Sequence, residues 1–470
     1  MPFRTVAAST RIFCGLRPAR GRLDSSYVAP ASSSAVDFDD RASLTAAHAA
    51  SLIARGALSA EALLDACLER IAKSDRGVRA WVYVDEPGAR GTARERDAEA
   101  RAGRRRGPLH GVPVAIKDIF HVAGMTTTCG AAPAFHTRPA EDATSVARLR
   151  AAGAVILGKA HTTEFAYFEP GPTRNPWNAA HTPGGSSSGS AAAVAARMAP
   201  LALGTQTVGS VLRPAAYCGV VGFKGTYGAI PTDGVVPLAW SLDHVGVFAR
   251  AVADVALAAG VLAARPMEAT PGRPPRLALA PELLERATPE VVAEVRAAAE
   301  RFARAGATVT EVTLPASFAG VHAAGRAVLE VEAAAYHEDL YKVHAGQYRP
   351  RTRELIAGGL TRPAVAYVRA QRARLAFRED VAALLAAHDA LLSPTAPSPA
   401  PEGLAATGDP WFCAPWSSAG VPALSLPSAL SPLGLPLAVQ LVGAASRDAE
   451  LLAVAAWCER VLDFTLSPPA

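Results

Sequence analysis

The sequence contains few lysines: only five of its 47 basic residues are lysine, and the others are arginine. Arginine stays protonated in proteins, whereas a buried lysine can lose its charge and accept a proton. Each lysine is therefore a candidate for a role that arginine cannot fill. The alternative is that it has simply not been replaced by arginine, by chance. The five are Lys73, Lys117, Lys159, Lys224 and Lys342.

Paired cysteines and long unbroken apolar runs are also missing. The six cysteines lie far apart without a C-x-x-C pair, which argues against a zinc site or a disulfide scaffold and favours a reducing, cytoplasmic location. The longest uncharged stretch lies between Asp409 and Arg447, and six prolines interrupt it. Because proline breaks helices, we do not expect this stretch to cross a membrane.

Strong charge of one sign is absent as well. The net charge of +5 is spread over 470 residues, so we expect neither a nucleic acid nor a membrane as a partner. Half of the residues are hydrophobic and 19% are charged, a composition that excludes intrinsic disorder for most of the chain. The composition thus predicts a globular protein, and a homodimer is left open.

Residues 1–36 differ from the rest of the chain. They are rich in arginine and serine, and no acidic residue precedes Asp24. We expect these residues to form a disordered tail and residues 37–470 to form one folded domain. A transit peptide and a wrongly assigned start codon are the alternatives.

The periodicity of the sequence predicts an α/β fold. Two packing helices come first, one capped by Ser43 and one entered at Ser59, and residues 92–106 have the charge of a solvated helix face. From Gly107 onward, apolar runs of strand length alternate with Gly-rich turns and Ala-rich helical stretches. Residues 276–314 have the spacing of a βαβ unit. The uncharged, Pro-rich stretch is expected to pack inside and form the wall of a pocket.

Three segments carry residues suited to catalysis, and the first ends at Lys117. This lysine follows an apolar run that is predicted to be a buried strand, so burial should lower its pKa and make it a base. The second segment, residues 183–196, is a Gly-Ser loop that leads into an Ala-rich helix. The simpler interpretations are a lysine that reaches solvent from the strand end and a loop that only caps the helix.

The third segment, residues 203–225, predicts an oxyanion hole beside a nucleophile. A strand is expected to break there into a loop that presents several backbone N–H groups beside one hydroxyl. A serine that merely caps the next helix is the alternative. The loop residues are Thr207, Val208, Gly209 and Ser210.

Other catalytic patterns fit less well. A phosphate-binding loop needs a lysine after its glycines, and none follows either glycine pair. Residues 185–189 satisfy G-x-S-x-G, but the segment before them does not have the pattern of a strand, which a nucleophile elbow requires. Eleven histidines leave a Ser-His-Asp triad open, although no spacing selects one of them.

Together, the three segments resemble the amidase signature family of amide hydrolases. The resemblance extends from about Asp37 to near Asp463 and includes LGKAHTTEFAYFEPGPTRNPWNAAHTPGGSSSGS, SLDHVGVFAR, GVPALSLP and LPLAVQLVG. It implies one large α/β domain with a central mixed β-sheet flanked by helices. It also implies that Lys117 is the terminal base, that Ser186 is the bridging serine after a cis peptide bond, and that Ser210 is the acylated nucleophile.

The sequence departs from the family pattern close to the expected nucleophile. Gln206 stands where the family usually has aspartate, Val208 where it has a second glycine, and Gly225 where it has proline. Arg213 lies one position later than the family's arginine. Because backbone N–H groups form the oxyanion hole, Val208 can still donate, provided that the loop needs no positive φ there.

The resemblance and these segments together predict an amidase that acts on a small-molecule substrate and requires no cofactor or metal. Ser210 would attack an amide, urea or carbamoyl carbonyl while Ser186 passes its proton to Lys117, and water would later release the acid from the acyl-enzyme. One alternative is the glutaminase-type component of an aminoacyl-tRNA amidotransferase, from which the departures at Gln206, Val208 and Arg213 lean away. The other alternative is a Gly-loop ligand-binding module without turnover.

Overall fold

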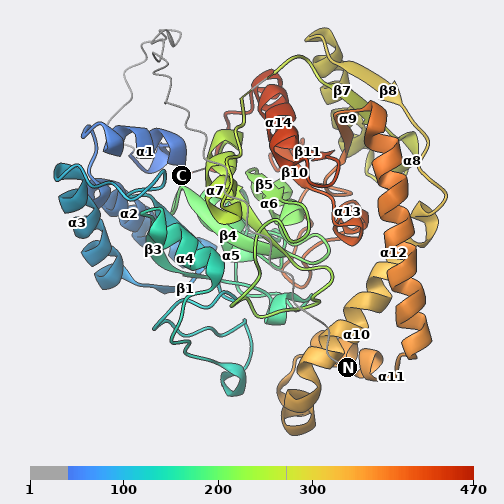
Figure 1. Cartoon of the computed structure of the whole chain (residues 1–470), viewed down its shortest axis with the longest axis horizontal. Helices are drawn as coiled ribbons and strands as arrows, with labels where there is room; N and C mark the ends of the chain where they lie inside the picture. The colour runs from blue at the N-terminus through green and yellow to red at the C-terminus, as the bar shows by residue number, and fades with distance from the viewer. Residues whose placement is uncertain (1–40, 271, 470) are drawn as a thin grey trace, which may run out of the picture. The chain divides into compact units, whose positions relative to one another are not determined.

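A computed structural model describes residues 41–270 and 272–469, and it confirms the α/β fold (Figure 1). The expected tail, residues 1–36, lies outside the described residues. The described residues form an eleven-stranded mixed sheet. Its strands are β1 (Trp81–Val84), β2 (Pro113–Lys117), β3 (Val155–Ala160), β4 (Leu201–Gln206), β5 (Val221–Lys224), β6 (His244–Ala249), β7 (Arg276–Leu279), β8 (Thr308–Glu311), β9 (Ala390–Pro394), β10 (Ala423–Leu430) and β11 (Pro436–Val442).

The order of the strands is β1, β3, β2, β4, β6, β5, β10, β11, β9, β7, β8. Neighbours are parallel in β3–β2–β4 and in β9–β7–β8, whereas the strands between these two groups pair antiparallel. The second group contains the predicted βαβ unit of residues 276–314, which the parallel pairing of β7 and β8 confirms. Parallel strands must be buried on both faces, so helices are required on each side of the sheet.

Fourteen α-helices accompany the sheet in the described ranges. They are α1 (Ala46–Ala54), α2 (Ala60–Val78), α3 (Glu86–Arg101), α4 (Thr144–Ala151), α5 (Ser188–Ala195), α6 (Leu212–Cys218), α7 (Val252–Ala263), α8 (Pro281–Leu284), α9 (Pro289–Arg304), α10 (Phe318–His344), α11 (Pro350–Thr361), α12 (Ala364–Leu384), α13 (Ala414–Ala419) and α14 (Asp448–Leu462).

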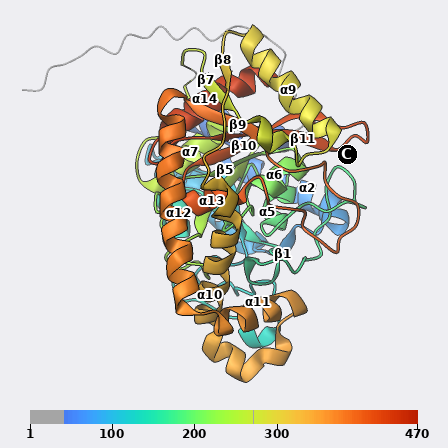
Figure 2. The same cartoon turned by 90° about the vertical axis from the view of Figure 1, so that its right-hand side faces the viewer.

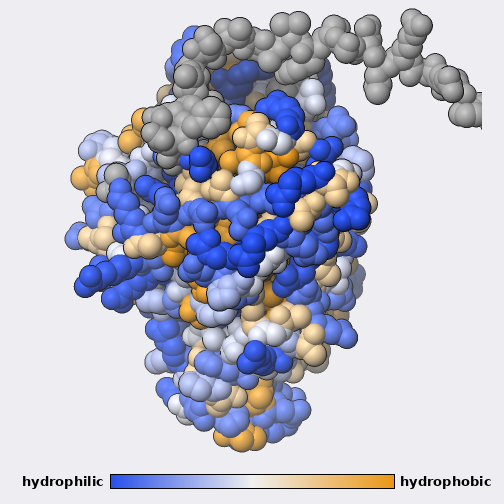
Figure 3. Space-filling model, turned by 90° about the vertical axis from the view of Figure 1, so that its left-hand side faces the viewer, coloured by the Kyte–Doolittle hydropathy of each residue, from blue (hydrophilic) through white to orange (hydrophobic). Residues whose placement is uncertain are grey.

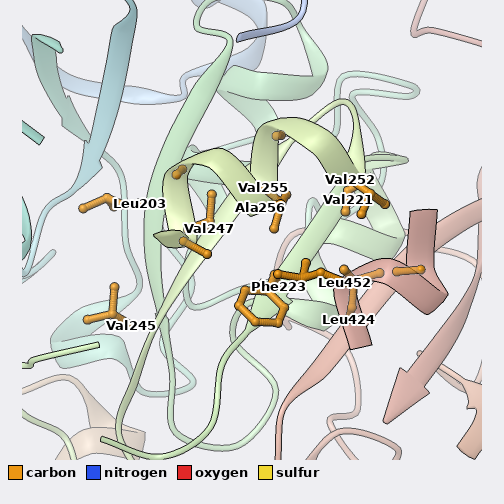
Figure 4. Close-up of a cluster of buried hydrophobic side chains, with 14 of the residues drawn as sticks. Leu203, Val221, Phe223, Val245, Val247, Val252, Val255, Ala256, Leu424 and Leu452 are labelled. Carbon is orange, nitrogen blue, oxygen red and sulfur yellow. The ribbon is translucent and has the colours of Figure 1, made fainter. Parts of the chain in front are cut away.

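Two apolar cores lie on opposite faces of the sheet, because successive side chains of a strand point to opposite sides. In β2, Val114 and Ile116 join one core, with α4, α7, α9 and α14, whereas Ala115 joins the other, with α2, α3, α5 and α6. Figure 4 shows part of the first core, in which side chains of β4, β5, β6 and β10 meet α7 and α14. The strand ends that carry the candidate site are therefore held from both faces.

One local expectation near the N-terminal end of the described chain is wrong, and another is confirmed only in part. Helix α1 is capped by the hydroxyl of Thr45 instead of Ser43, which lies in a preceding 3-10 turn. Helix α3 presents only part of its charge to solvent, since Arg96 and Asp97 are buried. The Asp97 carboxylate accepts hydrogen bonds from the first N–H groups of α2, so its charge offsets the positive end of that helix. The predicted cap of α2, Ser59, is confirmed.

The region from α10 to β11 contains elements that the sequence did not predict. Helices α10 and α12 pack side by side, and Figure 2 draws α10 in gold and α12 in orange. The Pro-rich stretch contains α13 and strand β10, which pairs with both β5 and β11. Pro427 lies in β10 where the register with β11 shifts, which is how a sheet accommodates a residue that lacks an N–H donor.

None of the helices in the described ranges is long and apolar enough to cross a bilayer. In Figure 3, hydrophilic residues cover most of one face of the molecule, and the apolar residues are scattered among them.

Candidate active site

Lys117 is the last residue of β2, and its side chain is fully buried. Its Nζ lies 2.8 Å from Ser186 Oγ and 2.7 Å from Thr205 Oγ1. No ion pair of the described residues includes it, and burial lowers the pKa of Lys117 well below its ordinary value, with Asp243 acting weakly in the opposite direction. This lysine does not reach solvent, and its environment favours the neutral amine.

Ser186 lies in the Gly-Ser loop that precedes α5, and it is 2% exposed. The Gly185–Ser186 peptide bond is cis, as expected. The Gly185 carbonyl accepts a hydrogen bond of 2.7 Å from Nη2 of Arg213, which extends from α6. The displaced arginine therefore holds the loop that presents Ser186.

Ser210 lies in the loop between β4 and α6 and is 8% exposed. Its hydroxyl makes no hydrogen bond with the described residues, so the expected bond between Ser186 and Ser210 is absent. Ser210 does not cap α6 either, because the cap position is Val211 and no side chain of the cap residue bonds there. The Ser210 hydroxyl is the one in this loop that has no structural partner.

The backbone N–H groups of the same loop are also available. Within the described chain, no hydrogen bond uses the N–H of Thr207, Val208, Gly209 or Ser210. Val208 is not among the non-glycine residues with positive φ, so the loop does not need the glycine that the family usually has there. Buried N–H groups are usually paired, and four successive unpaired ones suit an anionic oxygen.

Gln206 explains how the loop is held without the usual aspartate. Its Oε1 accepts from the N–H groups of Val211 and Leu212 at 2.9 and 3.0 Å, so it supplies the cap of α6. Its Nε2 donates to Ser417 Oγ at 2.9 Å, and that hydroxyl donates to the Val208 carbonyl at 3.0 Å. An aspartate could not donate to Ser417, so this link from α13 to the loop depends on the amide.

The other serines of the Gly-Ser loop have structural partners. Ser187 is fully buried, and its hydroxyl both donates to the carbonyl of Thr205 and accepts from its N–H, at 3.2 Å each. Ser188 and Ser190 donate to the carbonyls of His161 and Leu203. These contacts hold the loop and α5 against β3 and β4.

The histidines near the site also have structural hydrogen-bond partners. Nδ1 of His244 contacts the carbonyls of Leu242 and Gln206, and Nδ1 of His181 contacts that of Ala400. Neither histidine is hydrogen-bonded to a serine of the candidate site. In the described ranges, no group of three or more histidine, cysteine or acidic side chains is placed to hold a metal ion.

A cavity of about 180 Å³ opens beside the loop. Thr207 and Val208 belong to its wall, together with residues of α10 and of the Pro-rich stretch from Asp409 to Ser418. The prediction that the Pro-rich stretch forms a pocket wall is therefore confirmed. A second cavity, of about 370 Å³, reaches Thr205, Thr207 and Asp243 from another direction.

Sequence reasoning missed three residues of this arrangement. Thr205 contacts Lys117, Ser417 holds Val208, and Asp243 accepts a hydrogen bond of 2.5 Å from the hydroxyl of Thr207. Burial raises the pKa of Asp243 to about 6. Thr205 had a local signal, since it lies two positions after Leu203 on the predicted strand and therefore on the same face. Ser417 and Asp243 come from distant segments and had no such signal.

Comparison with known proteins decides the family. Residues 62–452 match the family model described as "Amidase", which covers more than half of the chain. The chain belongs to the amidase signature family.

Relatives within the amidase signature family differ in their described activities. The chain is 38% identical to the A subunit of glutamyl-tRNA(Gln) amidotransferase from Roseiflexus castenholzii, over 91% of this chain and 97% of that one. A crystal structure of an amidase superposes with a TM-score of 0.84 at 35% identity, over 89% of this chain and 99% of that one. The peptide amidase of Stenotrophomonas maltophilia gives 0.77 at 32% identity, over 91% and 98%. The family of the chain is thus shown, but the names of these relatives point to more than one kind of substrate.

Proposed function

We propose that this protein is an amidase that hydrolyses a carboxylic amide through Ser210, Ser186 and Lys117. One observation carries the proposal: a fully buried lysine without a carboxylate partner lies 2.8 Å from the Ser186 hydroxyl. Such a lysine can act as a base at neutral pH, because burial disfavours its charged form. The family supports the assignment, and the end of β4 leads directly into the loop that carries Ser210.

The proposed reaction begins when Ser210 Oγ bonds to the substrate carbonyl carbon. The Ser210 proton moves to Ser186 Oγ as the Ser186 proton moves to Lys117 Nζ. Collapse of the tetrahedral intermediate breaks the C–N bond, and a proton returns through Ser186 to the leaving nitrogen. Water then attacks the acyl-enzyme by the same route and releases the acid.

The loop residues would stabilise the negative oxygen of the intermediate. The N–H groups of Thr207, Val208, Gly209 and Ser210 have no other partner in the described chain, so each is free to donate. A single oxyanion donor is commonly worth about 3 kcal/mol of transition-state stabilisation. Residues 37–470 are proposed to form the catalytic domain, and the five described cysteines, all free and buried, support a cytoplasmic location.

A fluorophosphonate probe followed by peptide mass spectrometry tests the nucleophile. We expect the label on Ser210, complete loss of labelling in Ser210→Ala, and retention in Ser187→Ala, because Ser187 is held by Thr205. A label on Ser187 would refute the assignment. Absence of any label together with absence of hydrolysis would favour the ligand-binding module.

The second candidate is the glutaminase-type component of an aminoacyl-tRNA amidotransferase, which the name of the Roseiflexus relative favours. Ammonia release should be measured from glutamine and from a panel of simple amides, ureas and carbamoyl compounds. The assay is run with and without the other components of such an amidotransferase. We expect hydrolysis of simple amides by the chain alone, and glutamine hydrolysis that needs the other components would support the second candidate instead.

A further inference from the structure

The 180 Å³ cavity is directly attached to the candidate oxyanion loop. Thr207 and Val208 belong to its wall, and so does Pro410, which packs on Gly209 so closely that an added Cβ would lie 2.9 Å from Pro410 Cβ. A group bonded to a carbonyl carbon at this loop would therefore extend into one of the two cavities that reach it. Neither Ser186, which must reach the leaving nitrogen, nor Lys117 lines the 180 Å³ cavity, whereas the other cavity is lined by Thr205, the neighbour of Lys117. The leaving group therefore faces away from the 180 Å³ cavity, and the acyl part is the group that would extend into it.

The wall of the cavity is mainly apolar. Phe168, Val208, Leu242, Leu329 and Trp411 contribute hydrophobic side chains from five separate segments. Apolar substrate groups gain free energy from leaving water for such a wall, in proportion to the area that they bury.

The two charged side chains of the wall do not provide a site for a substrate carboxylate. The guanidinium of Arg326 forms an ion pair with Glu330 and donates to the Tyr167 hydroxyl at 2.8 Å. Asp409 accepts from the Trp411 N–H at 2.9 Å and forms no ion pair among the described residues. The remaining negative charge would repel a carboxylate, so the cavity disfavours an acidic group. The apolar remainder of the wall cannot replace the hydration of a charged group, and it therefore favours an uncharged one.

Two polar atoms in the wall lack partners. Ser418 Oγ is buried without a hydrogen bond, and so is Nε2 of His322, whose ring stacks on Trp411 at 5.0 Å. A buried polar atom without a partner is unfavourable, so a substrate that supplies one hydrogen-bonding atom would relieve the cost. An acyl group with one such atom fits this wall better than a pure hydrocarbon does.

We propose that this cavity selects the acyl group of the substrate. The group that it accepts is uncharged and largely apolar and carries one hydrogen-bonding atom; a hydroxyphenyl group is an example. The proposal rests on the amidase function proposed above. Glutamine, which carries a carboxylate and an ammonium group on its acyl chain, is a poor match for this cavity. The preference concerns only the part of the substrate beyond the carbonyl.

Gly325 offers a way to fill the cavity from α10. A Cβ at this position would lie 3.3 Å from Ser418 Oγ, so Gly325→Leu places its side chain in the cavity, and Gly325→Ala is the milder change. Gly320→Leu is the matched control, because it lies on the same helix with no atom within 4 Å of its Cβ. Glycine is a poor helix former, so the replacements do not weaken the helix itself.

The test measures binding by calorimetry in the Ser210→Ala background, so that it does not depend on turnover. The ligands are 3-(4-hydroxyphenyl)propionamide, 3-phenylpropionamide, propionamide and succinamate. We expect the two aryl amides to bind at least about tenfold more tightly than propionamide, and succinamate to bind most weakly. Gly325→Leu should remove most of the aryl preference and Gly325→Ala a part of it, while Gly320→Leu keeps it. His322→Phe should remove only the preference for hydroxyphenyl over phenyl.

The outcomes separate this inference from the proposed function. Equal binding of aryl amides to the Gly325 and Gly320 variants, or tight binding of succinamate, would overturn the selectivity even if the wild-type enzyme hydrolyses amides. If the wild type hydrolyses no amide but the expected binding pattern is intact, the amidase proposal is overturned, whereas the selectivity of the cavity is upheld.

Discussion

Two buried lysines on neighbouring strands have different surroundings. Lys117 ends β2 and Lys159 lies in β3, the strands pair in parallel, and both side chains are fully buried. Nζ of Lys159 forms an ion pair with Asp118 at 2.8 Å and contacts the Thr127 hydroxyl at 3.0 Å. The side-chain partners of Lys117 are hydroxyl groups alone.

The comparison teaches that burial does not by itself make a lysine a base. A carboxylate at hydrogen-bond distance stabilises the ammonium ion, whereas hydroxyl groups accept and donate with either protonation state. Lys159 with Asp118 therefore forms a structural ion pair, whereas Lys117 contacts Ser186, with which it exchanges protons in the proposed mechanism. The following predictions test this difference, from the largest expected effect to the smallest.

Lys117→Ala and Lys117→Arg should each lower kcat by about 10³-fold or more, because the first removes the base and the second cannot be deprotonated. Steady-state kinetics on the best amide substrate measure this, with circular dichroism to show that the variants are folded. Lys342→Arg is the control, since Lys342 is exposed and pairs with Glu338 and Asp339. A Lys117→Arg enzyme with a substantial fraction of wild-type kcat would contradict the role of Lys117 as a base.

Lys159→Met should destabilise the fold by about 3–5 kcal/mol, because the buried carboxylate of Asp118 loses its cation and keeps only the hydrogen bonds from Thr128. Urea denaturation measures the free energy of unfolding. Lys117→Met should lower the free energy of unfolding much less, since no carboxylate loses an ion-pair partner in this variant. If the two methionine variants lose equal stability, the contrast between the lysines is wrong.

The pH dependence of kcat/KM should show an acid limb only. Burial lowers the pKa of Lys117 well below 10.5, and the neutral amine is the active form, so activity rises with pH through the lowered pKa and then stays level. A lysine with its ordinary pKa would instead give an increase of about tenfold per pH unit between about pH 8 and 10.

A variant of Asp243 gives a second test of the pH profile. Its negative charge raises the pKa of Lys117, so Asp243→Asn should move the acid limb to lower pH while the plateau stays within about tenfold. A limb that moves to higher pH would show that the limb does not report on Lys117.

Ser417→Ala should have the smallest effect, a fall in kcat of about tenfold with little change in KM. The variant breaks the link from Gln206 to the Val208 carbonyl, so the oxyanion donors are held less firmly. The control is Ser428→Ala, a buried serine of β10 that donates to Leu437. Equal kinetic effects of the two variants would argue against a positioning role for Ser417.

Local sequence patterns determined the fold class and the strands that carry the site. Apolar runs predicted β2 and β4, and the spacing of residues 276–314 predicted a βαβ unit, because strand and helix periodicity is a local property of the chain. The resemblance assigned Lys117, Ser186 and Ser210. The order of eleven strands, the placement of β10 between β5 and β11, and the α10–α12 pair depend on contacts between distant segments, which periodicity does not encode.

The sequence by itself singled out five lysines and made Lys117 the candidate base. Only the tertiary structure decided that Lys159 has a carboxylate partner and that Lys117 has hydroxyl partners, since Asp118 and Ser186 take their places through strand pairing and loop packing. The same holds for Gln206: the sequence marked it as a departure, and the fold gave it Ser417 as a partner 211 positions away. Protonation depends on neighbours in space, and those neighbours are set by the folded chain.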